Sequence, residues 1–209
     1  MQQLLLELAP SPPPTLENFS PGKNGAAIQA LRQALAGGEG FVFLWGPGGS
    51  GKTHLLRAFS AAATAARREA AAADDVARLG EAEQLALFDR CNRLRASKGA
   101  LAASAEAPPA QLPLRADLRS RLASGIVLQL APLSDDDKAA ALTAHAARRG
   151  MSVDRGLITY LLGHFDRDMG TQIALLDALD RYSLERKRPT TLPLLKEALR
   201  SLAESEARR

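Results

Sequence analysis

Apolar residues in the first two thirds of the chain follow two kinds of pattern. Apolar runs of strand length occupy residues 41–45 (Phe-Val-Phe-Leu-Trp) and 126–130 (Ile-Val-Leu-Gln-Leu), and a weaker, alanine-rich strand pattern covers residues 99–104. Helix-prone stretches lie between and beside these strands, at residues 26–36, from 54 onward, at 83–95 and at 117–123. Strands that alternate with helices predict an α/β fold in which a parallel sheet is flanked by helices.

The pattern becomes purely helical after Pro132. Ser134 precedes Asp135-Asp136-Asp137, which predicts a helix N-cap with acidic residues in the first turn, and Gly150 is expected to end that helix. Three further helical stretches follow, at residues 154–164, 168–187 and 192–204. We therefore divide the chain into a tail (1–20), an α/β core (21–131) and a small all-helical C-terminal unit (132–209).

Residues 1–20 are expected to form an extended tail, because Ser11-Pro12-Pro13-Pro14 favours a solvated spacer. The leucine-rich opening is not typical of a signal peptide, since it lacks a basic region and Glu7 interrupts its short apolar run. No segment approaches the ~20 apolar residues of a membrane helix. A single cysteine, Cys91, excludes an internal disulfide, so we expect a cytoplasmic protein.

The composition favours helices and argues against an extensive nucleic-acid surface. Hydrophobic residues make up 46% of the chain, which is ample for a core, but aromatic residues make up only 4%. The formal net charge is a modest +4. Basic residues gather only in short groups such as Arg67-Arg68, Arg148-Arg149 and Arg186-Lys187-Arg188, which are more typical of solvated helix ends than of DNA contacts.

One motif carries specific chemistry. Gly46-Pro47-Gly48-Gly49-Ser50-Gly51-Lys52-Thr53 is an unbroken G-x-x-x-x-G-K-T phosphate-binding loop, and it lies between the predicted strand 41–45 and a predicted helix. Its glycines let backbone N–H groups surround a triphosphate, Lys52 is suited to the β- and γ-phosphate oxygens, and the Thr53 hydroxyl is suited to Mg²⁺. The alternative is a glycine-rich turn that binds nothing. Agreement between the motif and its strand–loop–helix context favours a nucleotide-binding protein.

A loop of this kind needs an acidic residue at the end of a neighbouring strand. Asp74-Asp75 is the candidate pair, with Asp74 holding Mg²⁺ and Asp75 orienting an attacking water. The preceding four alanines have low strand propensity, so the pair also fits surface acids at the end of a helix.

The spacing between the loop and these acids is short. Lys52 and Asp74 are 22 positions apart, which accommodates one helix and one strand but no additional strand–helix pair. Either the protein lacks an edge strand, or the chain omits a stretch between about Arg68 and Ala70. We favour the omission, because loss of the edge pair would expose apolar surface on the sheet.

These motifs together resemble the AAA+ ATPases of the DnaA group, over nearly the whole chain. The resemblance rests on the loop, Asp74-Asp75, the strand that ends at Ser104, Asp117-Leu118-Arg119-Ser120-Arg121-Leu122 and the helical unit. Thr15-Leu16-Glu17-Asn18-Phe19, followed by Asn24, is similar to the segment that leads into the ATPase core in that group. The fold that this implies is a P-loop AAA+ core with a helical lid.

Within the group, the chain is most similar to regulators that inactivate the replication initiator. It ends near Arg209, directly after the helical unit, so we expect no DNA-binding helix-turn-helix domain. Gln3-Leu4-Leu5-Leu6-Glu7-Leu8 is similar to the Q-L-x-L-x-L peptide by which such regulators bind the sliding clamp. The Gln3 amide has both donor and acceptor groups, and Leu4, Leu6 and Leu8 are suited to an apolar groove. A leucine-rich segment packed on its own domain is the alternative.

Three more residues match positions of the group's motifs. Ser104 matches the sensor 1 residue near the γ-phosphate, and Arg167 matches the sensor 2 arginine of the lid. Arg121 matches an arginine finger, which completes the active site of a neighbouring molecule. The alternatives are a strand-terminating serine, an arginine paired to Asp166 or Asp168, and a solvated cluster with Arg115 and Arg119.

The resemblance implies a regulator that binds ADP or ATP with Mg²⁺, attaches to the sliding clamp and presents Arg121 to ATP held by DnaA. DNA would be reached only through the clamp, and a homo-oligomer stays open. A self-hydrolysing AAA+ motor or loader acting on DNA and a small-molecule kinase are the alternatives from other classes. His54, His145 and His164 have no metal-ligand spacing.

Overall fold

The computed structural model describes residues 13–38, 40–165 and 169–206, with side chains as far as Arg200. These residues fall into two compact units, which divide between Leu133 and Ser134. Each unit has its own apolar core, so each is described by itself.

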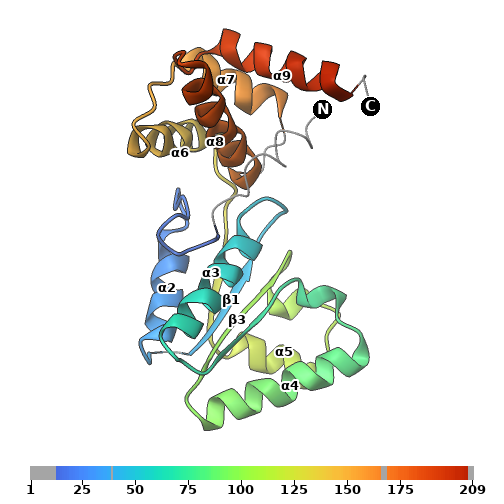
Figure 1. Ribbon diagram of the computed structural model, residues 1–209. Coiled ribbons are helices and arrows are strands. Elements are labelled where there is room, and N and C mark those ends of the chain that lie inside the picture. The colour runs from blue at the N-terminus through green and yellow to red at the C-terminus, as the bar shows by residue number, and fades with distance from the viewer. Residues whose placement is uncertain (1–12, 39, 166–168, 207–209) are drawn as a thin grey trace. The chain divides into compact units, whose positions relative to one another are not determined.

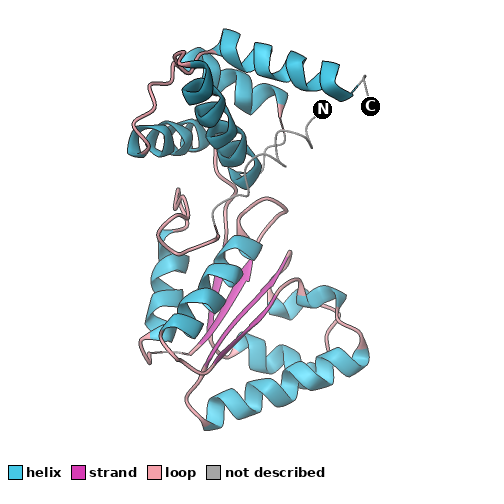
Figure 2. Cartoon of the chain, viewed as in Figure 1, coloured by secondary structure: helices cyan, strands magenta, loops and turns pink. Residues whose placement is uncertain are grey.

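The first unit is built on a parallel sheet of four strands in the order β2-β3-β1-β4 (Figure 2). The strands are β1 (Phe41–Trp45), β2 (Ala70–Ala73), β3 (Ala100–Ala105) and β4 (Ile126–Gln129). Val42 of β1 lies opposite both Ala102 of β3 and Ile126 of β4 in the register. The parallel sheet expected from the alternating pattern is confirmed.

Helices cover both faces of this sheet (Figure 1). α2 (Gly25–Leu35) and α3 (Lys52–Ala65) pack on one face, and α4 (Glu81–Ala96) and α5 (Ala116–Ala123) pack on the other. An apolar cluster lies on each face of the sheet, and the side chains of β1 alternate between them. Val42 and Leu44 belong to the cluster under α2 and α3, and Phe41 and Phe43 belong to the cluster under α4 and α5. Burial on both faces explains why β1 is apolar without interruption.

β2 resolves the ambiguity of the four alanines. They form a strand that pairs with β3 from Ala70↔Ala100 to Ala73↔Ala103. The pairing with a buried neighbour overrides the low strand propensity of alanine. Two short 3₁₀ turns, Val76–Arg78 and Pro109–Gln111, were not expected from the sequence.

The structure shows how the given chain connects α3 to β2, while the omission of a stretch before Ala70 stays a prediction. α3 leads directly to β2 through a tight turn, in which Arg67 adopts a left-handed conformation (φ 50°) and the Arg68 amide donates to the Ala63 carbonyl. The chain continues into β2 without interruption, and the Ala100 amide donates to the Glu69 carbonyl. Among the described strands, β2 is therefore the edge of the sheet.

The second unit contains four helices among its described residues. They are α6 (Asp135–Arg148), α7 (Arg155–His164), α8 (Met169–Arg186) and α9 (Leu192–Glu206). Ser134 caps α6 as predicted, since its Oγ accepts from the Asp137 amide at 3.1 Å, and Gly150 follows the helix with φ 72°. Leucines from all four helices, including Leu142, Leu161, Leu176 and Leu195, form the core.

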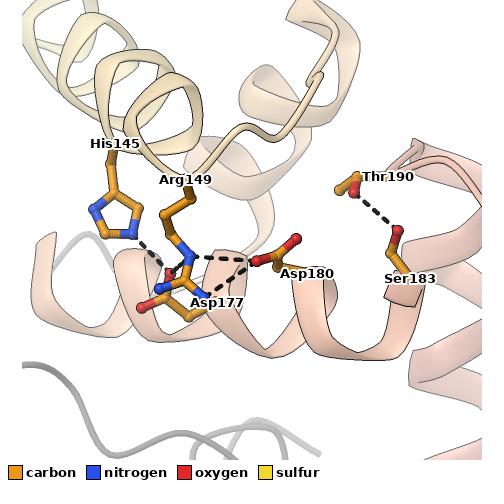
Figure 3. A network of polar contacts seen from close by, with 6 residues as sticks. All are labelled: His145, Arg149, Asp177, Asp180, Ser183 and Thr190. Carbon is orange, nitrogen blue, oxygen red and sulfur yellow. Dashed lines mark hydrogen bonds and ion pairs between the residues drawn. The ribbon is translucent and has the colours of Figure 1, made fainter. Parts of the chain in front are cut away.

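A polar network joins α6 to α8 in this unit (Figure 3). His145 Nε2 lies 2.7 Å from Asp177 Oδ1, while Arg149 contacts Asp177 through Nε at 3.3 Å and Asp180 through Nη2 at 3.1 Å. The two carboxylates are only 14% and 13% exposed, so they need these cationic or N–H partners. The cluster stabilises the packing of α6 on α8.

We expect Arg149→Met to lower the free energy of unfolding of the helical unit by about 2 kcal/mol, because it leaves two largely buried carboxylates with fewer partners. Urea denaturation followed by circular dichroism measures the change. The control is Arg148→Met, because Arg148 is exposed and its side chain forms no ion pair or hydrogen bond with the described residues. We expect a change of less than about 0.5 kcal/mol for this control. Equal effects of the two substitutions would contradict a stabilising role for the network.

No helix in the described part of the chain is both long and apolar enough to cross a membrane.

Candidate nucleotide-binding site

The phosphate-binding loop connects β1 to α3 and depends on two glycines. Gly51 has φ 92° and caps α3, and a Cβ at this position would lie 2.5 Å from the Phe19 ring. A Cβ on Gly46 would lie 2.3 Å from the Leu130 carbonyl oxygen. Conformation and close packing therefore both require glycine here.

The other groups of the loop fit a polyphosphate. Lys52 Nζ donates to the carbonyls of Gly46 (2.7 Å) and Pro47 (2.9 Å), which keeps the ammonium at the loop. The Ser50 hydroxyl is buried and has no hydrogen-bond partner in the structure. The amides of the first turn of α3, a helix of 14 residues, add the positive end of a helix dipole. A cation, a buried hydroxyl without a partner and the amides of a helix N-terminus lie at one place, and together they suit a nucleoside di- or triphosphate.

The structure brings Thr53, Asp74 and Ser104 together from three separate elements. Thr53 Oγ1 donates to Asp74 Oδ2 at 2.6 Å, and Ser104 Oγ donates to Asp74 Oδ1 at 2.5 Å. Asp74 directly follows β2, and Ser104 lies near the end of the adjacent parallel strand β3. A carboxylate beside a loop threonine is a donor set typical of Mg²⁺ bound with a nucleotide, so these residues would hold such an ion.

Asp75 lies apart from this cluster. It has a left-handed backbone (φ 47°), and its carboxylate forms an ion pair with Arg78 Nε at 2.7 Å. Its amide donates to Ser104 Oγ at 3.2 Å, so its backbone supports the cluster although its carboxylate points to Arg78. A role of this carboxylate in orienting water stays a prediction, and it requires the partly exposed ion pair to open.

α5 presents Arg121. Leu118 and Leu122 on the buried side of this short helix anchor it in the core. The half-buried Arg121 lies with its guanidinium carbon 5.9 Å from the centre of the Phe88 ring on α4. Among the described residues, no carboxylate forms an ion pair with Arg121, whereas Arg115 nearby is paired with Asp117 at 2.9 Å. The guanidinium is held by an aromatic ring and keeps its N–H donors for another acceptor.

The residues around α5 are a buried glutamine, an aspartate at its start and a buried cysteine. Gln84 is buried, and its side chain accepts from the Arg115 amide at 2.9 Å and donates to the Leu79 carbonyl at 2.9 Å, which fixes the start of α5. A hydrogen bond from Arg115 lowers the pKa of Asp117. Burial raises the pKa of Cys91 to about 11, despite Arg121 and Arg95 nearby, so this cysteine is a neutral core residue.

Comparison with known proteins places this chain in a family. The family model for the lid domain of Hda matches residues 135–199. A protein of Haemophilus influenzae is 35% identical over 214 aligned positions, which cover 88% of this chain and 93% of that relative. The chain belongs to the Hda-like family. The aligned positions outnumber the residues of this chain that they cover, so the relative contains insertions that this Hda-like protein lacks.

Solved structures show that the Hda-like chain has the AAA+ fold of DnaA. Domain III of DnaA from Thermotoga maritima superimposes with a TM-score of 0.68 at 19% identity, over 90% of this chain and 95% of that one. AMPPCP-bound DnaA from Aquifex aeolicus gives a TM-score of 0.65 at 24% identity, over 83% and 68%. RuvB from Thermotoga maritima gives 0.62 at 17% identity, over 93% and 73%. The predicted P-loop AAA+ core with its helical C-terminal part is confirmed.

Some predicted residues of the Hda-like protein lie outside the part that the structure describes. These are the sensor 2 candidate Arg167 and the residues of the tail peptide, Gln3, Leu4, Leu6 and Leu8. Their proposed roles stay predictions.

Sequence reasoning also missed a contact between the N-terminal segment and the loop. The Phe19 ring lies against Gly51 and 5.4 Å from the His54 ring, and His54 Nε2 donates to the Thr15 carbonyl at 3.1 Å. Thr15 and Asn18 exchange two side-chain hydrogen bonds with each other's amides, which shapes this segment. Only the Thr-x-x-Asn spacing carried a local signal. The pairing of Phe19 and His54 depends on residues far apart in the sequence.

Proposed function

We propose that this Hda-like protein inactivates the replication initiator DnaA by supplying Arg121 to the ATP that DnaA holds. The observation that carries the proposal is the environment of Arg121 on a DnaA-like AAA+ core. The residue belongs to the anchored helix α5, its guanidinium lies over Phe88, and no carboxylate of the described residues forms an ion pair with it. A guanidinium donates several hydrogen bonds in a planar fork, which suits phosphate oxygens that gain charge during hydrolysis.

The chain's own nucleotide site is proposed to bind ADP or ATP with Mg²⁺. The loop amides and Lys52 would hold the phosphates, and Thr53 and Asp74 would hold the ion. Mg²⁺ would neutralise phosphate charge there. Ser104 donates a hydrogen bond to Asp74 and so positions that carboxylate. Because the Asp75 carboxylate is paired with Arg78, we propose that turnover at this site is slow and that the bound nucleotide mainly stabilises the fold.

The tail is proposed to tether the protein to the sliding clamp through Gln3, Leu4, Leu6 and Leu8. A tether raises the effective concentration of Arg121 near DnaA that is bound to the same DNA. Its expected affinity is modest, about micromolar, because the gain from buried leucines is offset by the entropy that a peptide loses on binding.

The experiment that tests this proposal compares clamp binding by the full chain with binding by a chain that lacks residues 1–8. We expect deletion to weaken capture on immobilised clamp at least about tenfold, because it removes the glutamine and all anchoring leucines. Gln3→Ala should reproduce part of the loss, and the control Gln2→Ala should not. Capture that is unchanged by the deletion would refute the tether.

A self-hydrolysing ATPase is the second candidate, and the contact of Thr53 and Ser104 with Asp74 favours it. ATP hydrolysis by the chain alone, measured without clamp or DnaA, separates the two. If the chain alone hydrolyses ATP as fast as the mixture that contains DnaA and clamp, the protein is a self-hydrolysing ATPase.

A further inference from the structure

The outer edge of β2 is an open sheet edge. β2 is the last strand in the order β2-β3-β1-β4, and β3 is the one strand of the described residues that pairs with it. The Glu69 carbonyl accepts from the Ala100 amide of β3. Because successive residues of a strand direct their backbone groups to opposite edges, the N–H and C=O groups of Ala70 and Ala72 point away from β3. These groups form a short template for an added strand.

A groove of about 500 Å³ runs along this edge. Its walls come from both helical layers: Ala63 and Thr64 belong to α3, and Leu87 and Arg90 belong to α4. The alanine side chains of β2 are small, so the groove exposes backbone as well as apolar surface. The short loop-to-acid spacing leaves this space open, because it holds no further strand–helix pair.

The charges of the groove select its occupant. Arg68 and Arg90 line it, no acidic residue lines it, and neither arginine forms an ion pair with a described carboxylate. Arg68 donates from Nη2 to the Lys98 carbonyl, while its Nε–H is buried without an acceptor. The nearest acids in the sequence, Glu69 and Asp89, are exposed and outside the lining. The groove is therefore basic.

We propose that this groove binds an extended acidic segment of a partner protein, which adds a fifth strand next to β2. Backbone hydrogen bonds to Ala70 and Ala72 would give the segment its register, and its carboxylates would face Arg68 and Arg90. The proposal does not depend on Arg121 or on the clamp.

The test uses the full chain and a capped hexapeptide of alternating valine and glutamate as the probe, followed by NMR. We expect the amide signals of Ala70 and Ala72 to shift on titration and their hydrogen exchange to slow, because both amides become hydrogen-bonded. The same peptide with lysine in place of glutamate, and the same peptide N-methylated at alternate residues, should bind at least about tenfold more weakly.

Two matched variants test the charge. Arg90→Glu should weaken binding of the glutamate peptide at least about fivefold and strengthen binding of the lysine peptide. Arg93→Glu, on the exposed surface of the same helix, should change neither affinity by more than about twofold. Ala72→Pro, which removes one outward N–H while leaving the β3 pairing, should abolish binding with an unchanged circular dichroism spectrum.

Other outcomes would overturn the proposal. Equal binding of all three peptides, or shifts that map away from β2, would show that the groove is not a strand site. A site that opens only after residues 1–12 are removed would assign it to the chain's own tail. Dimerisation that Ala72→Pro abolishes would assign it to a second copy. Displacement of the peptide by oligo(dT), together with loss of oligo(dT) binding in Arg90→Glu, would assign it to nucleic acid.

Discussion

Replacing Arg121 with alanine should reduce clamp-dependent ATP hydrolysis by DnaA by about 10³-fold or more, to the rate of DnaA alone. The substitution removes the guanidinium that α5 presents to a partner's phosphates under the proposed mechanism. It should leave the fold intact, because Leu118 and Leu122 anchor the helix and Arg121 forms no described ion pair. Release of phosphate from DnaA-bound ATP, in the presence of clamp loaded on DNA, measures the effect.

Two substitutions serve as controls for this prediction. Arg119→Ala removes a half-buried arginine from the same helix and should retain most of the stimulation. Arg121→Lys keeps the charge but loses the planar fork of donors, so it should restore only a small fraction of the rate. Clamp capture should be the same for all of these variants. Stimulation that survives Arg121→Ala would exclude this residue as the arginine finger.

Lys52→Ala should weaken the binding of ADP and ATP at least about 100-fold, which corresponds to about 2.7 kcal/mol. In the structure the ammonium is bonded to two carbonyls of its own loop, so it is available for a phosphate at little cost. Its loss also leaves the negative charge of the nucleotide facing backbone amides alone. Isothermal titration calorimetry measures the affinity, and the rise in Tm that ADP causes in the parent chain should disappear.

The fold of the Lys52 variant should change little without nucleotide, because the side chain stabilises only an exposed loop. Lys23→Ala, at an exposed position outside the loop, is the control and should bind nucleotide as the parent chain does. Unchanged affinity in Lys52→Ala would mean that the loop does not hold the phosphates, and the proposed nucleotide site would then fail.

Much of the fold followed from local patterns. The strand 41–45 and the cap at Ser134 appear where the sequence predicts them, since each signal lies within a few neighbouring residues. The four alanines before Asp74 were ambiguous between a strand and the end of a helix, because alanine has low strand propensity. Pairing with β3 decided their structure, and that pairing joins residues about thirty positions apart.

The sequence predicted the residues of the candidate site but only some of the contacts between them. The motif placed Thr53 and Asp74 in one site, and the resemblance added Ser104; the structure shows all three in contact. The ion pair that turns the Asp75 carboxylate to Arg78 was not expected. The contact between Arg121 and the Phe88 ring was also not expected, because it joins α5 to α4, which pack together only in the folded core.

By itself, the sequence determined that this protein has a phosphate-binding loop between a buried strand and a helix, followed by a separate helical unit. Glycine conformation, apolar periodicity and helix caps act over a few residues, so the local sequence is enough to specify them. Only the tertiary structure decided that β2 ends the sheet, that Arg68 and Arg90 border its open edge, and that Arg121 rests on Phe88 without an acidic partner among the described residues. Each of these features depends on contacts between segments that are distant in the sequence. The free energies of such contacts cannot be judged from a local sequence pattern.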